Sequence, residues 1–162
     1  MLLRKGWLLA VAVALGVCVT GLRAQMPNPY GAPMSLENAK KAAEAALAEA
    51  RKNNWTMAVA VVNPDGTLIY FEKMDGTQNG SAQVAIDKAR TAANYKRSTK
   101  ALQDAVAAGG EGLRVLRLAG ATPIEGGLPL LMDGKIVGAI GVSGGTSAQD
   151  GQCAKPGADL FR

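Results

Sequence analysis

The sequence predicts a single α+β domain in which an antiparallel sheet is covered by helices. Two observations indicate this fold class. Short apolar, β-branched runs occur in pairs joined by tight turns, as in β-hairpins, and segments with helical spacing precede, separate and follow these pairs. Because hairpins form antiparallel pairs, this order favours α+β over a doubly wound parallel sheet. The length of 162 residues, 48% of them hydrophobic, fits one domain with an ordinary core.

The first 24 residues have the pattern of an export signal. Arg4 and Lys5 precede an almost wholly apolar stretch, residues 6–19, and Ala24 is a small residue at the expected cleavage site. An uncleaved membrane anchor is the alternative, but the apolar stretch is shorter than the roughly 20 residues that a spanning helix needs. We therefore expect residues 1–24 to be a signal peptide and the mature protein to be periplasmic or secreted.

Removal of this segment changes the charge of the chain. The whole sequence carries a net charge of +5, whereas residues 25–162 hold 15 basic and 13 acidic residues, a net charge of +2. The basic character therefore gives little support for a nucleic-acid or membrane partner. The sequence has no histidine, which excludes catalytic triads and zinc sites that depend on it. Cys153 is the single cysteine after residue 24, so an exported chain has no internal disulfide.

The N-terminal part of the exported chain is predicted to be an arm followed by a helix. Residues 25–34 contain three prolines and are expected to be extended, either mobile or packed on a neighbour. The domain is predicted to occupy residues 35–162. Ser35 is expected to cap a helix that begins at Leu36 and stops at Asn53.

A hairpin and a second helix come next. Strands are predicted at residues 55–62 and 67–71, joined by a turn at residues 63–66. After a polar loop, residues 81–96 resume helical spacing. The small residues of this helix are Ala85, Ala89, Ala92 and Ala93. They allow the helix to approach another backbone closely, which suits a tight interface.

The middle of the chain is less regular. A short helix is predicted to begin at Ser98 or Thr99 and to end at Ala108, where two glycines follow. Residues 113–118 are compatible with a strand or a helical turn, and we favour a strand.

The strongest hairpin signal lies near the C-terminus. An apolar run at residues 128–132 and a second one at residues 135–142 are separated by Asp133-Gly134. Both turn positions need positive φ, which Asp and Gly tolerate, so a tight hairpin is predicted.

A glycine turn and a helix follow this hairpin. Thr146 or Ser147 is a candidate N-cap after Gly144-Gly145, and Asp150 lies in the first helical turn. The free N–H groups of such a helix start could hold a carboxylate or a phosphate. Alternatively, the glycines only let the chain turn sharply and pack the helix on the sheet.

Two parts of the chain carry a resemblance to a known family. The matching segments are Gly126-Gly127-Leu128-Pro129-Leu130, Asp133-Gly134, residues 137–145, Asp150 and Lys88-Ala89-Arg90-Thr91-Ala92. Together they are similar to the GlcG/HbpS-like haem-binding family, which includes the C-terminal domain of some corrinoid adenosyltransferases. The resemblance covers about residues 35–160. It implies a profilin-like α+β fold, with an antiparallel sheet of about five strands flanked by helices, and assembly into dimers or larger rings.

The resemblance also implies a site for haem or a related tetrapyrrole. Such a site needs an apolar slot, cations or N–H groups for the propionates and usually an axial ligand. We expect the slot between the helix at residues 81–96 and a neighbouring subunit. The candidate cofactor-binding residues are Lys88, Arg90, Thr91, Tyr95, Glu125, Gly126, Gly127, Ser143, Gly144, Gly145 and Asp150. The iron ligand is left open: Tyr95, Met132 and Cys153 are candidates, as is an oxygen donor such as Thr91, although each also suits a core or an interface.

Two carboxylates leave a catalytic alternative open. Glu125 and Asp150 could converge at the ends of the hairpin and serve acid–base chemistry or bind a cation. Alternatively, Asp150 caps the helix and Glu125 is solvated. We assign no catalytic residue.

The first functional hypothesis is an exported, non-catalytic binding protein for haem or a related tetrapyrrole, in redox or cofactor sensing or handling. The alternatives are a small-molecule enzyme using these carboxylates, or an accessory module of an exported oxidoreductase. The expected partners are further copies of the chain and a tetrapyrrole or carboxylate ligand, with no nucleic acid and no stable membrane span after signal removal.

Overall fold

A four-stranded antiparallel sheet, in the order β2-β1-β4-β3, forms the centre of the protein. The structure is a computed structural model that describes residues 27–161. Its elements are α1 Leu36–Lys52, β1 Ala58–Val62, β2 Leu68–Lys73, α2 Ser81–Asn94, α3 Thr99–Ala107, the 3₁₀ helix η1 Gly110–Arg117, β3 Gly127–Met132, β4 Lys135–Ser143 and α4 Ser147–Asp159. The predicted signal peptide, residues 1–24, lies outside the described residues.

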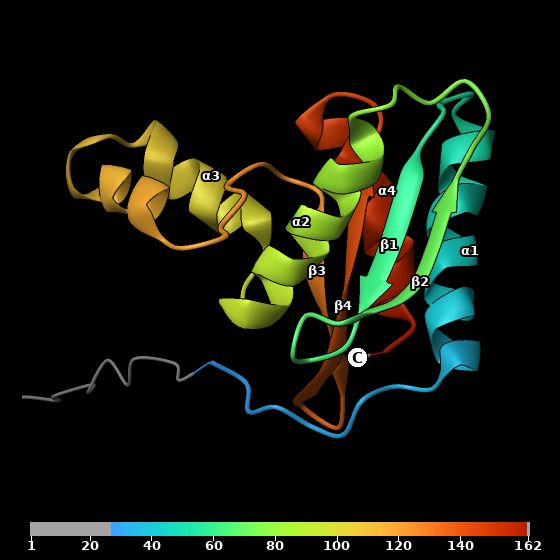
Figure 1. Cartoon of the computed structure of the whole chain (residues 1–162), viewed down its shortest axis with the longest axis horizontal. Coiled ribbons are helices and arrows are strands. Elements are labelled where there is room, and N and C mark those ends of the chain that lie inside the picture. The colour runs from blue at the N-terminus through green and yellow to red at the C-terminus, as the bar shows by residue number, and fades with distance from the viewer. Residues whose placement is uncertain (1–26, 162) are drawn as a thin grey trace, which may run out of the picture.

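Helices cover both faces of the sheet. The helix α2 packs on one face, whereas α1 and α4 pack side by side on the other, and α3 with η1 projects from the body (Figure 1). The predicted α+β class is therefore confirmed, with four strands in the described part of the chain instead of about five. None of the helices among the described residues combines the length and apolar character that a membrane crossing needs.

The capping and turn residues in the sequence predicted several ends of helices and strands correctly. The Ser35 hydroxyl accepts a hydrogen bond from the Asn38 amide at the start of α1. Thr146, one of the two predicted N-caps, begins α4 through a reciprocal capping box with Gln149. Asp133 and Gly134 have φ angles of 50° and 70° in the turn between β3 and β4, as predicted.

The strand predicted at residues 113–118 is wrong, because residues 113–117 lie within η1 and Leu118 is its C-cap. Gly109 and Gly110, with φ angles of 70° and 53°, turn the chain between α3 and η1, and η1 packs on α3. Leu113 and Leu116 are three residues apart and so lie on the same side of this 3₁₀ helix, and η1 has no buried residue. Without a neighbouring strand, the apolar residues of η1 remain at the surface.

The alanine face of α2 is used within the chain. Ala85, Ala89, Ala92 and Ala93 are fully buried against the sheet. A Cβ atom at Gly141 of β4 would overlap the carbonyl oxygen of Ala85 and lie 2.5 Å from the amide nitrogen of Ala89. The close approach that we expected at a tight interface therefore occurs between α2 and the sheet of the same chain.

The N-terminal arm packs on its own domain. The carbonyl oxygen of Pro29 accepts a hydrogen bond of 2.8 Å from the Ile136 amide, and the Gly31 amide donates one of 2.8 Å to the Ile136 carbonyl. Met34 donates to the carbonyl oxygen of Val137 at 3.1 Å. Strand β1 ends at Val62, opposite Ala139, so the arm pairs with the part of β4 that β1 does not reach. These hydrogen bonds contradict the expectation of a mobile arm, while packing of the arm on a neighbouring subunit stays a prediction.

Candidate functional site

At one end of β4, a buried ion pair links α2 and α4, the helices on opposite faces of the sheet. The Nζ atom of Lys88, on α2, lies 2.6 Å from Oδ2 of Asp150, in the first turn of α4. The same Nζ donates a hydrogen bond of 3.1 Å to the carbonyl oxygen of Val142. The Lys88 and Asp150 side chains are only 1% and 4% exposed. The pair is therefore enclosed by the protein and out of direct contact with solvent.

Burial shifts both members of this pair toward their neutral forms. It lowers the pKa of Lys88 and raises the pKa of Asp150, because a charge loses its hydration inside the protein. The hydrogen bond and the attraction between the two groups oppose both shifts. The Gly145 amide also donates to Oδ1 of Asp150 at 3.0 Å. The amide of the glycine turn that could have held an external carboxylate therefore holds Asp150.

Gly126 lies directly against the ion pair. Its φ of 129° is rare for residues with a side chain, and a Cβ atom there would lie 2.9 Å from Nζ of Lys88 and 2.6 Å from the carbonyl oxygen of Val142. Because Gly126 has no side chain, the backbone can pass directly against the ion pair just before β3 begins. Glu125 and Gly126 also line a pocket on the outer side, so the pair lies just behind the wall of that pocket.

The remaining predicted residues hold loops and element ends. Arg90 donates from Nε to the Gly66 carbonyl at 3.2 Å. The Thr91 hydroxyl donates to the Asp87 carbonyl at 2.7 Å and accepts from the Thr122 amide at 2.8 Å. The Tyr95 hydroxyl donates a hydrogen bond of 2.6 Å to the Ala119 carbonyl, and the Ser143 hydroxyl donates one of 3.3 Å to the Ser81 hydroxyl. Whether any of these residues contacts a ligand stays a prediction.

The structure thus brings together only part of the predicted set. Lys88, Asp150, Gly126 and Gly145 meet around the ion pair. Arg90, Thr91 and Tyr95 lie on α2 or at its end, and their polar contacts are to other segments. Neither of the two pockets described below is lined by Gly144-Gly145.

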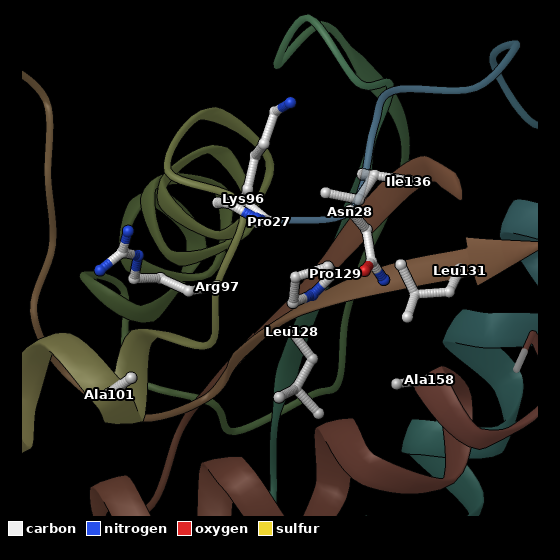
Figure 2. A pocket seen from close by; sticks show the side chains of 10 residues that line it. All are labelled: Pro27, Asn28, Lys96, Arg97, Ala101, Leu128, Pro129, Leu131, Ile136 and Ala158. Carbon is white, nitrogen blue, oxygen red and sulfur yellow. The ribbon is translucent and has the colours of Figure 1, made fainter. Parts of the chain in front are cut away.

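The larger pocket lies along the exposed edge of β3, and we call it the β3-edge pocket. It has a volume of about 540 Å³, within the range of small-molecule sites. Its lining residues are Pro27, Asn28, Lys96, Arg97, Ala101, Leu128, Pro129, Leu131, Ile136 and Ala158. Figure 2 shows apolar side chains of β3 at its centre and the two cationic side chains on one side, their charged ends directed away from that centre. The pocket therefore combines an apolar floor with a cationic rim.

A smaller pocket adjoins it, which we call the glycine pocket. Its volume is about 350 Å³, and it shares Ala101 and Leu128 with the β3-edge pocket. Its other lining residues are Ser98, Lys100, Asp104, Glu125, Gly126, Gly127, Gly151 and Lys155. The two lysines of the wall already form ion pairs, with Asp104 and Asp159. The β3-edge pocket is therefore better suited to an anionic ligand.

Sequence reasoning missed Lys96 and Arg97 as site residues. The available signal was weak: two adjacent cations stand between a helix end and the Ser98 N-cap. Only the fold places them beside β3 and the N-terminal arm. Lys96 also has an unusual backbone, with a φ of 54°.

The four candidate iron ligands, Thr91 among them, lie outside both pockets. Tyr95 and Met132 are absent from the pocket linings, and so is Cys153, which is fully buried on α4. Among the described residues, no three His, Cys, Asp or Glu side chains are grouped as a metal site would require.

Cys153 is expected to be inert in the native protein. Burial raises the pKa of its thiol to about 12, so the reactive thiolate is scarce at neutral pH. We expect 5,5′-dithiobis(2-nitrobenzoate) to label Cys153 at least about 100-fold faster in urea than in the folded state. Equal rates in the two states would show that this thiol is accessible.

Comparison with known proteins agrees with this architecture. The family model described as "Haem degrading protein HbpS-like" matches residues 34–159. The chain belongs to the HbpS-like family. Within it, the chain is 40% identical to the GlcG protein of Escherichia coli K12 over 95 residues, which are 59% of this chain and 69% of GlcG.

Two solved structures extend the family comparison. A double mutant of HbpS from Streptomyces reticuli superposes with a TM-score of 0.74 at 27% identity, covering 98% of this chain and 99% of that one. A complex of PduOC with haem superposes with a TM-score of 0.71 at 26% identity, covering 80% of this chain and 96% of that one. The recognised resemblance to the GlcG/HbpS-like family is thus confirmed.

Proposed function

We propose that this HbpS-like protein is an exported, non-catalytic binding protein for haem or a related tetrapyrrole, which it holds in the β3-edge pocket. The observation that carries the proposal is the pairing of an apolar floor with two cations on one side. A tetrapyrrole such as haem is a flat apolar ring with carboxylates at one edge, and the pocket matches that division. The pattern of residues 1–24 supports export.

The apolar floor would hold the ring. Its side chains are Leu128, Pro129, Leu131, Ile136 and Ala158. Leu128 and Leu131 are partly buried, so apolar surface remains to be covered by a ligand. Ring contact with this floor would supply most of the affinity, because burial of apolar area is the main favourable term in such sites.

The rim would hold the carboxylates. Arg97 is exposed, and its Nε donates to the Tyr95 carbonyl at 3.1 Å, which leaves the outer nitrogens of the guanidinium directed to solvent. Lys96 lies next to it on the same side of the pocket. Cations at an exposed rim bind carboxylates through charge-assisted hydrogen bonds without the cost of burying either charge.

The pocket fits the ring and the carboxylates better than the iron. The described residues that line it include no histidine, cysteine, methionine or tyrosine, the side chains that usually ligate haem iron. Iron coordination therefore has no evident role in holding the ligand. When bound, haem would supply redox chemistry, while the chain itself contributes the apolar floor and the cationic rim.

The comparisons support the class of ligand. The family description refers to haem, and the related PduOC was solved in complex with haem.

We further propose that the chain self-associates. The projecting segment supports this, because Leu113, Leu116, Leu118 and Ile124 are between 39% and 61% exposed there.

The test is a comparison of ligands with and without iron. We expect the purified protein to bind haemin, with a shift of the Soret band, and to bind metal-free protoporphyrin IX with a Kd within about tenfold of the haemin value. Arg97→Gln is expected to weaken both about three- to tenfold. Arg114→Gln is the control, since this exposed arginine on η1 pairs with Glu111 away from the pocket.

Three results would contradict the proposal. Absence of a Soret shift would remove haem as a ligand. Strong haemin binding with no detectable binding of protoporphyrin IX would assign affinity to the iron and not to the pocket's floor and rim. Decay of the Soret band of bound haemin on addition of ascorbate would show turnover, in keeping with the description of the family as haem degrading.

A further inference from the structure

One wall of the β3-edge pocket comes from outside the region that the family model matches. Pro27 and Asn28 line the pocket, whereas the match begins at residue 34. The arm that carries them is held by the backbone hydrogen bonds of Pro29 and Gly31 to Ile136, and Ile136 is itself a pocket residue. The shape of this pocket therefore depends in part on a segment that lies outside the region matched by the family model.

Tyr30 links the arm to one of the two rim cations. Its hydroxyl donates to the carbonyl oxygens of Ala93 at 2.9 Å and Asn94 at 3.3 Å, at the C-terminal end of α2. Its ring lies under the ammonium of Lys96, with Nζ 4.0 Å from the ring centroid. This distance is well within the range of a cation–π interaction. The arm thus fixes the side chain of a residue that lines the pocket.

Lys96 adopts a backbone conformation that is uncommon for lysine. Lys96 follows the C-cap residue Tyr95 and has a φ of 54°, a left-handed conformation in which glycine is the usual residue. A lysine is disfavoured there on conformational grounds alone. Such outliers are retained where the surrounding structure holds them, and they cluster at functional sites.

We propose that residues 27–34 are a specificity element of the β3-edge pocket, in which Tyr30 is a positioning residue that holds Lys96 to receive a ligand carboxylate. This inference rests on the proposed binding function and adds a selection rule to it. The pocket prefers tetrapyrroles with free carboxylates over those whose carboxylates are blocked. The arm, through Tyr30, sets the size of that preference.

The selection rule is tested by comparing haemin with haemin dimethyl ester, which has the same ring and iron but no carboxylate. We expect Tyr30→Leu and Lys96→Gly each to raise the haemin Kd about three- to tenfold and to leave the ester Kd within about twofold. The double variant should bind haemin no more weakly than the weaker single variant, because both changes remove the same interaction.

Two variants separate positioning from a structural effect. Tyr30→Phe retains the ring under Lys96 and is expected to retain most of the preference for haemin, although it loses both hydroxyl hydrogen bonds. Tyr70→Leu is the control, because Tyr70 lies on β2 and does not line the pocket. Lys96→Gly places the favoured residue at a left-handed position, so it is expected to fold even if Tyr30→Leu does not.

Hydrogen exchange gives a readout that does not depend on affinity. The amides of Gly31 and Ile136 are bonded across the junction of arm and β4. Haemin is expected to slow their exchange in the wild-type protein and to slow it less in Tyr30→Leu, because bound ligand holds the arm through Lys96 and Tyr30.

The outcomes distinguish this inference from the function on which it rests. If the wild-type protein does not bind haemin, the proposed function is wrong. The wild-type protein could bind haemin while the Tyr30 and Lys96 variants lose affinity for haemin and for its ester to the same extent, or lose affinity for neither. In that case the pocket remains the proposed binding site, but the arm has no role in selecting the ligand. Unchanged exchange at Gly31 and Ile136 on haemin binding would also overturn the role of the arm.

Discussion

Lys88→Met is expected to lower the free energy of unfolding by about 3–5 kcal/mol at pH 7. Removal of the ammonium leaves the Asp150 carboxylate enclosed without its cation, and it leaves the carbonyl oxygen of Val142 without the hydrogen bond from Nζ. A buried, uncompensated charge is one of the few defects that single substitutions produce at this cost. Urea unfolding followed by circular dichroism measures the change.

A second substitution should restore much of the lost stability. In Lys88→Met/Asp150→Asn the charge is gone, while the side-chain oxygen of residue 150 can still accept the hydrogen bond from Gly145. Lys41→Met is the surface control, because Lys41 forms an ion pair with Glu37 in which the two side chains are 59% and 76% exposed. This substitution should lower the free energy of unfolding by less than about 1 kcal/mol. A Lys88→Met variant as stable as Lys41→Met would show that the Asp150 site is open to water.

The defect of Lys88→Met is also expected to depend on pH. Burial already raises the pKa of Asp150, and loss of its partner removes the lysine contacts that lower it. In the variant, the folded state therefore binds a proton at a pH where the unfolded carboxyl, with an ordinary pKa of 3.8, does not. Stability then rises as the pH falls from neutral toward this value. The gap between the variant and the wild-type protein should narrow over that range.

This ion pair illustrates why the site was only partly predictable. Ala85 and Ala92 lie three residues before and four after Lys88, so helical spacing places Lys88 on the alanine face of α2, but this spacing does not identify its partner. Its partner is 62 residues away, and the two meet only because α2 and α4 cover opposite faces of β4 at the same end. The sequence therefore indicated both residues as site candidates but not their mutual neutralisation.

The same distinction applies to the fold. Caps and tight turns depend on a few adjacent residues, so Ser35, Thr146 and Asp133-Gly134 could be read directly from the sequence. The course of the segment at residues 113–118 depends on whether a neighbouring strand is available, which no local pattern reports. The arm was predicted, but its pairing with β4 was missed for a similar reason, because its hydrogen bonds fill a position that opens only where β1 ends before β4 does.

The close contact between α2 and the sheet leads to the second large effect. Gly141→Ala is expected to lower the free energy of unfolding by about 3 kcal/mol or more and the Tm by about 10 °C. The added methyl group would overlap the main-chain oxygen of Ala85 and lie 2.5 Å from the amide nitrogen of Ala89. Because these are backbone atoms of a helix, no side-chain rotation relieves the overlap, and α2 must move away from β4.

A glycine with free space supplies the control for this variant. Gly80 precedes α2, its φ is −62°, and no atom lies within 4 Å of the position where its Cβ would be, so Gly80→Ala should change stability by less than about 0.5 kcal/mol. Adding Ala89→Gly to Gly141→Ala should rescue little, because it removes the methyl group 3.0 Å away but neither main-chain contact. Full rescue would mean that side-chain crowding, and not the closeness of the helix backbone to the sheet, sets the cost.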